Sequence, residues 1–562
     1  MSSEISSEYE YTDKMRATVV EWMYDVVVAE ENTRYVFQSA VIIYDEYLSK
    51  DSVKRSDLQA IASVALHLAS AMERPDIISL EDLCYWSNDT YTEKFLSNIK
   101  KIVLEKLNYY VGHETILQHI IGSNYSFTND ESFFLANYLS HLFFWQKEYQ
   151  LFEPRVLANK IIEFSMITQK KQQSLQRLIN NDPVYNYLYL IWCNDKNYPR
   201  TSIEKDFAKK KYFAISTKEI PKIIPRYTDS HFIQNLVQPI VTIKHSIKIY
   251  TDDEFKNFKI LETLGQGAYG KVFRYLIKSP NNNQNVVAIK MPNKMDDLPQ
   301  DMLNEINCLR KINHSNIIKL HGLYYHPDKN KFLMIMECMD IDLERLANNY
   351  GSKPFAEDLK ISFIIQLLKA VSYIHNLGIY HWDISTKNIL ISKDGILKLA
   401  DFGFSRWARY PGQKLHSDDI CVVIYRPIEV LLRYGKYNDK VDVWSCACVI
   451  GFMLNNNKYL MKEYYNNDMV EIIYNYLGTP RPGFNEDVCL WPGFSKPKKI
   501  FEGTKFYTLD DKYPDEVKIL YRMFEYHPDR RISSEQALNM FKELHKKLAQ
   551  KIDSKIEFQF NI

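Results

Sequence analysis

The spacing of apolar residues changes along the chain and divides it into two parts. From Met15 to about Ile224, apolar positions recur at helical spacing, short polar stretches interrupt them, and glycine is scarce. This pattern predicts an all-helical first part. Over residues 226–257 the periodicity weakens around RYTDSHF and the acidic TDDEF, which predicts a linker whose middle has the composition of a short strand.

After Phe258 the pattern changes again. The runs LETLGQGAYGKVFRYLI, NVVAIKM and FLMIMEC read as strands separated by turns, and helical periodicity follows from about Ile341. The pattern therefore predicts that the second part of the chain forms two lobes, a strand-rich lobe over 258–338 and a helix-rich lobe over 342–550.

Bulk composition narrows the class of protein further. The chain has 562 residues, which is too long for one hydrophobic core, and its 71 basic and 70 acidic residues give no global attraction to nucleic acid or membrane. The polar N-terminus and the absence of about eighteen consecutive apolar residues predict neither a signal peptide nor a membrane span, so we expect an intracellular protein of the cytoplasm, the nucleus or both. Eight cysteines are scattered, and the pair Cys446 and Cys448 lacks a second pair of metal ligands, so reduced thiols are expected.

A glycine motif, G-x-G-x-x-G-x-V, stands between two strand-like runs at Gly265, Gly267, Gly270 and Val272. Glycines let backbone N–H groups approach phosphate oxygens without an intervening side chain. Such a motif is weak by itself, and a dinucleotide site would need a helix directly after it. Here VFRYLI continues as a strand, which favours a glycine flap over ATP.

Four further residues or short motifs that can handle phosphate follow the glycine motif along the chain. Lys290 ends the strand-like run Val287–Lys290, where it can neutralise the α- and β-phosphates, although a lone lysine of this kind is more often a solvated strand end. Glu305 lies in a helical run and is suited to pair with Lys290. The remaining two are the spacing H-x-D-x-x-x-x-N at His381, Asp383 and Asn388, and the triplet Asp401-Phe402-Gly403. Their joint occurrence predicts phosphoryl transfer.

From about residue 258 to 547 the chain resembles eukaryotic protein kinases of the cyclin-dependent branch. Residues 299–305, PQDMLNE, stand where that family has its PSTAIRE helix, and LGTP at 477–480 and WPG at 491–493 resemble two of its signatures. The resemblance implies ATP and Mg²⁺ as cofactors, with Asp383 accepting the proton of the substrate hydroxyl and Asn388 and Asp401 holding magnesium. It assigns the nucleotide to Gly265, Gly267, Gly270, Val272, Ala288, Lys290, Glu337, Met339 and Asp342. It also implies a gatekeeper at Met336 and a structural ion pair between Glu429 and Arg531.

The chain departs from the family at several positions. Trp382 and Asn304 replace two of the three arginines that gather a phosphate on the activation loop, and Arg406 remains, so phosphate capture at Ser417 is expected to be weak. Ser385 replaces the lysine typical of Ser/Thr kinases, and Lys387, two residues further on, is the alternative catalytic lysine. Tyr269 matches the inhibitory phosphotyrosine position, and an aromatic flap over the nucleotide is an equally good interpretation.

The helical part resembles a cyclin. MRATVVEW from Met15 and IIYDEYLS from Ile42 resemble the opening helices of a cyclin box, and Arg16 and Asp45 match its buried ion pair. The resemblance places a first box at 1–112 and a second helical repeat at 113–225. Ala71 and Lys100 stand where cyclins usually have the lysine and glutamate that grip the kinase. Met15, Val19 and Trp22 form one helical stripe, which is either ordinary core or part of a groove that recruits substrates.

These observations predict an all-α two-repeat cyclin fold followed by an α+β bilobal kinase fold. The corresponding function is an ATP-dependent Ser/Thr protein kinase acting on protein substrates, activated by its own cyclin part docking in cis or in trans. The alternative is a pseudokinase and cyclin scaffold that binds partners without phosphoryl transfer. An ATP-dependent metabolic enzyme would leave the helical part unexplained.

Overall fold

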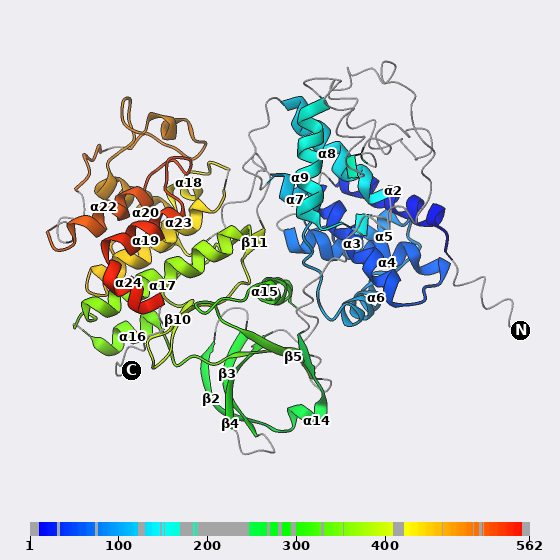
Figure 1. The fold of residues 1–562 in the computed structure, drawn as a ribbon, viewed down its shortest axis with the longest axis horizontal. Coiled ribbons are helices and arrows are strands. Elements are labelled where there is room, and N and C mark those ends of the chain that lie inside the picture. Colours follow the sequence, from blue (N-terminus) through cyan, green and yellow to red (C-terminus); the bar gives the residue numbers. More distant parts are fainter. Residues whose placement is uncertain are drawn as a thin grey trace, which may run out of the picture. The chain divides into compact units, whose positions relative to one another are not determined.

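The computed structural model divides the chain into two compact units, Met1–Lys244 and His245–Ile562 (Figure 1). The structure describes residues 11–30, 34–73, 77–121, 130–145, 149–150, 152–168, 184–185, 188, 247–266, 270–278, 284–293, 299–326, 331–351, 353–407, 421–435, 437–462, 465–497, 499–504, 509 and 511–553.

The first unit is helical throughout its described part, as the apolar periodicity predicted. Its α-helices are α2 (Asp13–Ala29), α3 (Arg34–Lys50), α4 (Leu58–Glu73), α5 (Leu80–Trp86), α6 (Glu93–Lys106), α7 (Ile116–Ile121), α8 (Asp130–Trp145) and α9 (Pro154–Thr168). Helix α4 is apolar on most of its faces because it packs against α2, α3, α5 and α6. Residues 189–246, which include the end of the expected second repeat, lie outside the described residues.

Two buried polar groups hold the helices of this unit together. The predicted pair is confirmed: the Arg16 guanidinium donates to both carboxylate oxygens of Asp45, at 2.7 and 2.6 Å, and to the Phe144 carbonyl at 3.1 Å. The side-chain amide of Gln38 lies 3.1 Å from Ser140 Oγ, and its oxygen accepts from the Leu117 N–H. These contacts join α2 and α3 of the expected first box to α7 and α8 of the expected second repeat.

The second unit begins with a six-stranded sheet in the order β1-β5-β6-β4-β3-β2. Its strands are β1 (Lys248–Tyr250), β2 (Phe258–Gln266), β3 (Gly270–Lys278), β4 (Gln284–Pro292), β5 (Leu320–His326) and β6 (Lys331–Glu337). All pairs are antiparallel except β1 with β5. Helix α15 (Gln300–Lys311) contacts β5, and together they form the small lobe (Figure 1).

Strand β1 lies in the range interpreted as a linker, in which a short strand was expected, but its pairing with the small-lobe sheet was not predicted. Gly322 of β5 makes room for it: a Cβ atom there would lie 2.5 Å from the Lys248 carbonyl and 2.5 Å from the Tyr250 ring. Beyond β1, the short helix α14 (Asp252–Phe255) stacks the Phe255 ring on Tyr324 of β5, with centroids 3.9 Å apart. A three-residue strand carries too little periodicity to be recognised without its partner strand.

The large lobe is mainly helical. Its elements are β7 (Ile341–Asp342), α16 (Leu343–Tyr350), α17 (Glu357–Asn376), β8 (Ile379–Tyr380), β9 (Ile389–Ile391), β10 (Leu397–Leu399), β11 (Arg406–Trp407), α18 (Ile428–Leu431), α19 (Lys440–Leu454), α20 (Asn466–Leu477), α22 (Pro514–Met523), α23 (Ser534–Leu544) and α24 (Lys546–Asp553). Helices α17 and α19 form its buried centre. The predicted ion pair is present: Arg531 donates to both oxygens of Glu429, at 2.7 and 2.8 Å. Cys446 and Cys448 of α19 are buried free thiols, as expected.

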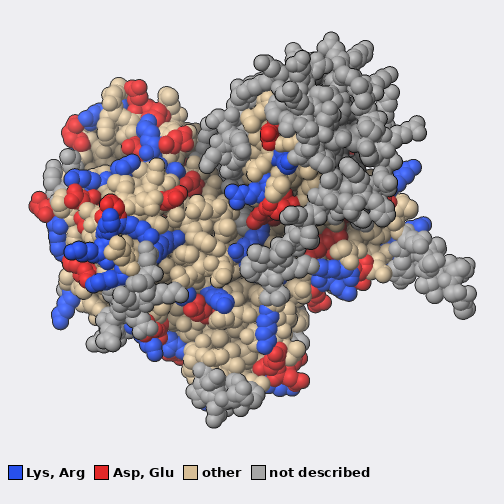
Figure 2. All heavy atoms as spheres, viewed as in Figure 1, with Lys and Arg blue, Asp and Glu red and all other residues tan. Residues whose placement is uncertain are grey.

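The surface carries no dominant charge on the face shown in Figure 2, where acidic and basic side chains alternate over the described residues. None of the described helices combines the length and the apolar character that crossing a membrane requires.

Candidate active site

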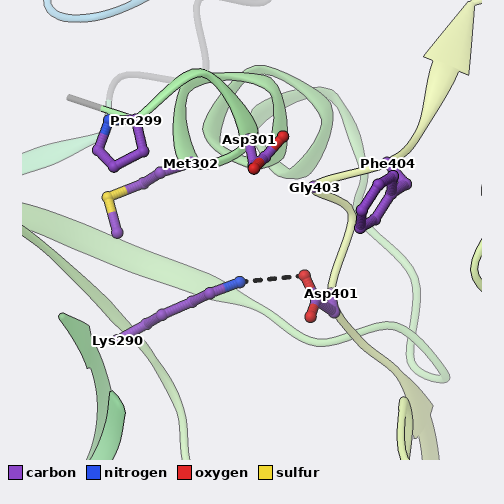
Figure 3. A pocket seen from close by; sticks show the side chains of 7 residues that line it. All are labelled: Lys290, Pro299, Asp301, Met302, Asp401, Gly403 and Phe404. Carbon is purple, nitrogen blue, oxygen red and sulfur yellow. Dashed lines mark hydrogen bonds and ion pairs between the residues drawn. The ribbon is translucent and has the colours of Figure 1, made fainter. Parts of the chain in front are cut away.

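An ion-paired triad lies between the sheet and the start of the large lobe. Lys290 of β4 places its ammonium 2.6 Å from Glu305 of α15. The same ammonium lies 3.0 Å from Asp401 (Figure 3). Burial lowers the pKa of Lys290, but the two carboxylates outweigh burial and raise it above its ordinary value. For Asp401, an acid, burial raises the pKa. The Lys290 ammonium more than offsets this effect, so the pKa of Asp401 lies below its ordinary value. The structure therefore joins three predicted residues with Lys290 cationic and Asp401 anionic.

A second pair lies on the loop between β8 and β9. Asn388 Nδ2 donates to the Asp383 carboxylate at 2.7 Å and to the Asp383 carbonyl at 2.8 Å. Burial and the nearby Asp401 charge raise the pKa of Asp383 to about 7. A carboxylate with this pKa is suited to accept a proton near neutral pH.

A buried carboxylate, Asp442 of α19, positions this loop. It accepts the backbone N–H groups of His381 and Trp382, both at 2.7 Å, and contacts His375 Nε2 at 2.9 Å. Trp382 has a φ of 59°, a left-handed conformation that these two hydrogen bonds hold in place. Sequence reasoning missed Asp442, although an acidic residue within the apolar helical run VDVWSCACVIGFML was a detectable signal.

The described part of the glycine motif lies on two neighbouring strands, β2 and β3, beside the strand that carries Lys290. Gly265 pairs with Val272, and Val272 pairs with Lys290, so the motif and the lysine lie side by side in the sheet. A Cβ atom on Gly270 would lie 2.3 Å from the Met291 carbonyl, so only glycine fits at that position. Gly267 and Tyr269 lie outside the described residues, as does Ser417.

The other residues predicted to contact the nucleotide lie on β4, at the end of β6 and on the segment that follows β6. Ala288 is buried and pairs with Met336, and the Met339 carbonyl lies 3.4 Å from the Arg274 guanidinium. The Glu337 N–H donates to the Lys319 carbonyl at 2.9 Å.

Asp342 has a structural role that the sequence did not reveal. Its carboxylate caps α16 by accepting the Arg345 N–H at 2.8 Å, and it pairs with the Arg345 guanidinium at 3.2 Å. Arg345 also donates to the Leu264 carbonyl at 2.6 Å, which joins α16 to β2. Sequence reasoning missed this arginine because its partner in β2 is distant along the chain.

A pocket of about 310 Å³, counting space open to solvent, lies beside the start of α15 and includes two of the predicted site residues, Lys290 and Asp401 (Figure 3). Its lining residues are Lys290, Pro299, Asp301, Met302, Asp401, Gly403 and Phe404. In Figure 3, Lys290 and Asp401 face one another on the side of the pocket opposite α15. One wall is therefore charged, and α15 supplies the other.

The donor set fits magnesium bound together with phosphates. Within the described residues, no three acidic, histidine or cysteine side chains gather closely enough to hold a metal by themselves. Mg²⁺ prefers oxygen ligands and commonly takes only one or two carboxylates together with substrate phosphates. Asp401 offers carboxylate oxygens and Asn388 an amide oxygen, because the Asn388 amide nitrogen is used on Asp383.

Lys387, the alternative catalytic lysine, forms an ion pair with Glu344 and none with Asp383. Its ammonium lies 3.8 Å from Glu344, and its side chain is 76% exposed. Ser385, which stands in place of the usual lysine, is buried. Lys387 is therefore the exposed lysine of this loop, held only by a long ion pair.

Comparisons with known proteins agree with both units. A family model described as "Protein kinase domain" matches residues 258–541, and one described as "Cyclin, N-terminal domain" matches residues 2–112. A protein of Acanthamoeba polyphaga mimivirus, named as a candidate serine/threonine-protein kinase (L673), is 29% identical over 553 residues, which cover 95% of this chain and 98% of the relative. Cyclin-dependent kinase 1 of Encephalitozoon cuniculi is 29% identical over 291 residues, which cover 50% of this chain and 95% of that kinase.

Proposed function

Because the chain belongs to the protein kinase family and carries a cyclin domain ahead of its kinase domain, we propose that it is a Ser/Thr protein kinase of cyclin-dependent type, activated by its own cyclin unit. The observation that carries the proposal is the ion pair of Lys290 with Glu305, assembled beside Asp401 and the Asp383–Asn388 pair.

Each residue has a role in this proposal. Lys290 neutralises the nucleotide phosphates, and Glu305 holds the Lys290 ammonium in place. Asp383 accepts the proton of the incoming hydroxyl, for which its pKa of about 7 is suitable. Asp401 and Asn388 would hold Mg²⁺, which when bound neutralises charge on the phosphates.

Lys387 takes the place of the missing lysine in this scheme. Its long ion pair with Glu344 exchanges easily, because the side chain is exposed and the attraction is screened by water. The flexible side chain can then approach the γ-phosphate. If Lys387→Met transfers phosphate at the rate of the unchanged protein, Lys387 has no such role.

Activation by the cyclin unit is supported by a relative whose alignment covers both units of this chain. The mimivirus alignment runs through both units, so a cyclin part and a kinase part occur together in more than one chain. Counted from residue 226 to the start of β1, a tether of about twenty residues spans roughly 25 Å as a coil and holds two units at an effective concentration near millimolar. Such a concentration compensates for the altered gripping residues Ala71 and Lys100.

We also propose that Met15, Val19 and Trp22 of α2 recruit protein substrates. All three are half-buried, unlike Val20 and Met23 on the same helix, which are fully buried. Trp22 Nε1 donates to the Trp86 carbonyl at 3.3 Å, which fixes the ring. Trp22→Ala should raise KM for protein substrates and leave KM for short peptides unchanged; equal effects on both would contradict this role.

Phosphate transfer tests the proposal directly. Radiolabelled ATP and Mg²⁺ are supplied with a protein substrate to the unchanged chain and to Asp401→Asn. We expect transfer by the unchanged chain and a loss of about 100-fold or more in the variant, since a preorganised charge is removed. Transfer by neither protein, or by both equally, would favour the scaffold without catalysis.

A further inference from the structure

Asn304 of α15 connects this helix to the segment that follows Asp401. Its side-chain Nδ2 lies 2.7 Å from the Ser405 carbonyl, 2.9 Å from the Gly403 carbonyl and 3.4 Å from the Phe402 carbonyl. The residue is 3% exposed. An amide nitrogen carries two protons, so the two short contacts use both of them.

The neighbouring residue strengthens the same connection. Glu305 pairs with Lys290 and also accepts the backbone N–H of Phe402. Two consecutive residues of α15 therefore hold both the lysine and residues 402–405. The inward position of α15 and the path of this segment depend on each other.

We call residues 401–429 the activation segment, of which the structure describes 401–407 and 421–429. Related kinases order this segment with arginines around a phosphate, and Arg406 is the remaining one of the three. Arg406 Nη1 donates to the Phe404 and Ser405 carbonyls, each at 2.8 Å, and the residue is buried. Its guanidinium thus contributes to the backbone contacts at the start of the segment.

The second described stretch of the activation segment is attached to Trp382 through its first residue, Cys421. Trp382 is 3% exposed and packs in an apolar cluster with Cys421, Val430, Tyr437 and Val441. The Cys421 thiol donates to the Trp382 carbonyl at 3.2 Å. Apolar contacts of this kind disfavour a phosphate dianion, which would lose its hydration there. The Arg426 guanidinium beside the cluster is already used, because it donates to the Cys421 carbonyl at 2.7 Å.

We propose that Asn304 and Trp382 are positioning residues that hold the activation segment by uncharged contacts, Asn304 at its start and Trp382 at Cys421. Phosphoryl transfer by this chain therefore does not require a phosphate on the segment. This inference rests on the proposed function. Beyond that function, it states that Asn304 and Trp382 take over the role of the two absent arginines.

The first test uses the unchanged protein. Its transfer rate is measured before and after phosphatase treatment, with mass spectrometry showing that residues 401–429 carry no phosphate. We expect the two rates to agree within about twofold. A drop of tenfold or more that rephosphorylation reverses would overturn the inference but leave the proposed function intact. No transfer in either state would instead remove the proposed function.

Two substitutions test the residues themselves. Asn304→Asp keeps the size of the side chain, removes both donors and places a carboxylate against carbonyl oxygens, so we expect a loss of tenfold or more in kcat. Asn313→Asp, the same change at an exposed position just after α15, is the matched control and should change kcat by less than twofold.

Trp382→Arg restores the residue that related kinases have. It should lower transfer by the unphosphorylated protein at least tenfold, because it places a cation in the apolar cluster. Asn304→Asp and Trp382→Arg proteins that fold and match the unchanged rate would contradict the roles given to these residues. Phosphatase treatment of the unchanged protein remains decisive if either variant fails to fold.

Discussion

Lys290 and Glu305 lie on different elements, fifteen residues apart, and their charged groups are 2.6 Å from one another. The pair is formed only when α15 lies close to β4. The presence of this ion pair therefore shows that α15 lies in its inward position.

We predict that Glu305→Gln lowers kcat/KM by about 100-fold, because Lys290 keeps only Asp401 as its partner and is no longer aimed at the phosphates. Steady-state phosphate transfer to a protein substrate measures the effect. Glu502→Gln is the matched control, since Glu502 is 80% exposed and pairs with Arg481 at 2.6 Å in the large lobe. Similar losses in both variants would show that the effect is not specific to the pair.

Breaking the buried pair of the cyclin unit should destabilise that unit strongly. Asp45→Asn leaves the Arg16 guanidinium uncompensated at a position where both side chains are 2% exposed, which costs about 3–5 kcal/mol. Calorimetric unfolding of the intact protein measures the loss. Lys106→Met breaks the exposed pair with Asp51 and should cost about 0–1 kcal/mol. Equal losses would refute the importance of burial.

Glu46 should make the stability of the cyclin unit depend on pH. Burial raises its pKa, but His113 at 3.1 Å and Lys50 at 2.5 Å outweigh this and lower the pKa to about 2. A depressed pKa contributes stability above the unfolded value near 4.5, and this stability is lost as the pH falls towards 2. The whole contribution is on the order of 3 kcal/mol.

Glu46→Gln should therefore be less stable than the unchanged protein at pH 7, and the gap should narrow by about 1 kcal/mol by pH 4. Denaturant unfolding of both proteins across this range measures the gap. A gap that stays constant from pH 7 to pH 4 would rule out this explanation.

Cutting the tether should separate the two units functionally. A protease site inserted within 226–244 is cleaved after folding, and transfer is then measured as the sample is diluted to nanomolar protein. We expect the rate to fall about tenfold or more on dilution and to recover on concentration, because cleavage removes the effective concentration that the tether supplies. Uncut protein carrying the same insertion is the control. If the cut sample stays fully active when dilute, the kinase unit does not depend on attachment.

The sequence predicted those parts of the site that depend on residue type at fixed spacing. Lys290, Glu305, Asp383, Asn388 and Asp401 could be predicted because phosphate and metal chemistry restricts the residue types at each position. The structure places Lys290 against Glu305 and Asp401, and Asn388 against Asp383. Relationships between distant elements could not be read in the same way. The sequence showed that Asn304 replaces an arginine, but its contact with Ser405 depends on how α15 packs against a loop about 100 residues later.

Strand β1 illustrates the same limit in the fold. Lys248–Tyr250 is too short to carry a recognisable pattern, and its place depends on the space left by Gly322 in a distant strand. The composition of a short strand was visible within 226–257, but nothing along the chain indicated which edge it would join.

The position of β1 also affects where this protein can be divided. A kinase fragment that starts at Phe258, where the family match begins, would lose β1 and expose the backbone donors and acceptors of β5 along an open edge. Bare edges of this kind pair readily with other copies and favour aggregation. A soluble catalytic fragment therefore has to keep the residues from 247 onward, although they precede the recognised domain.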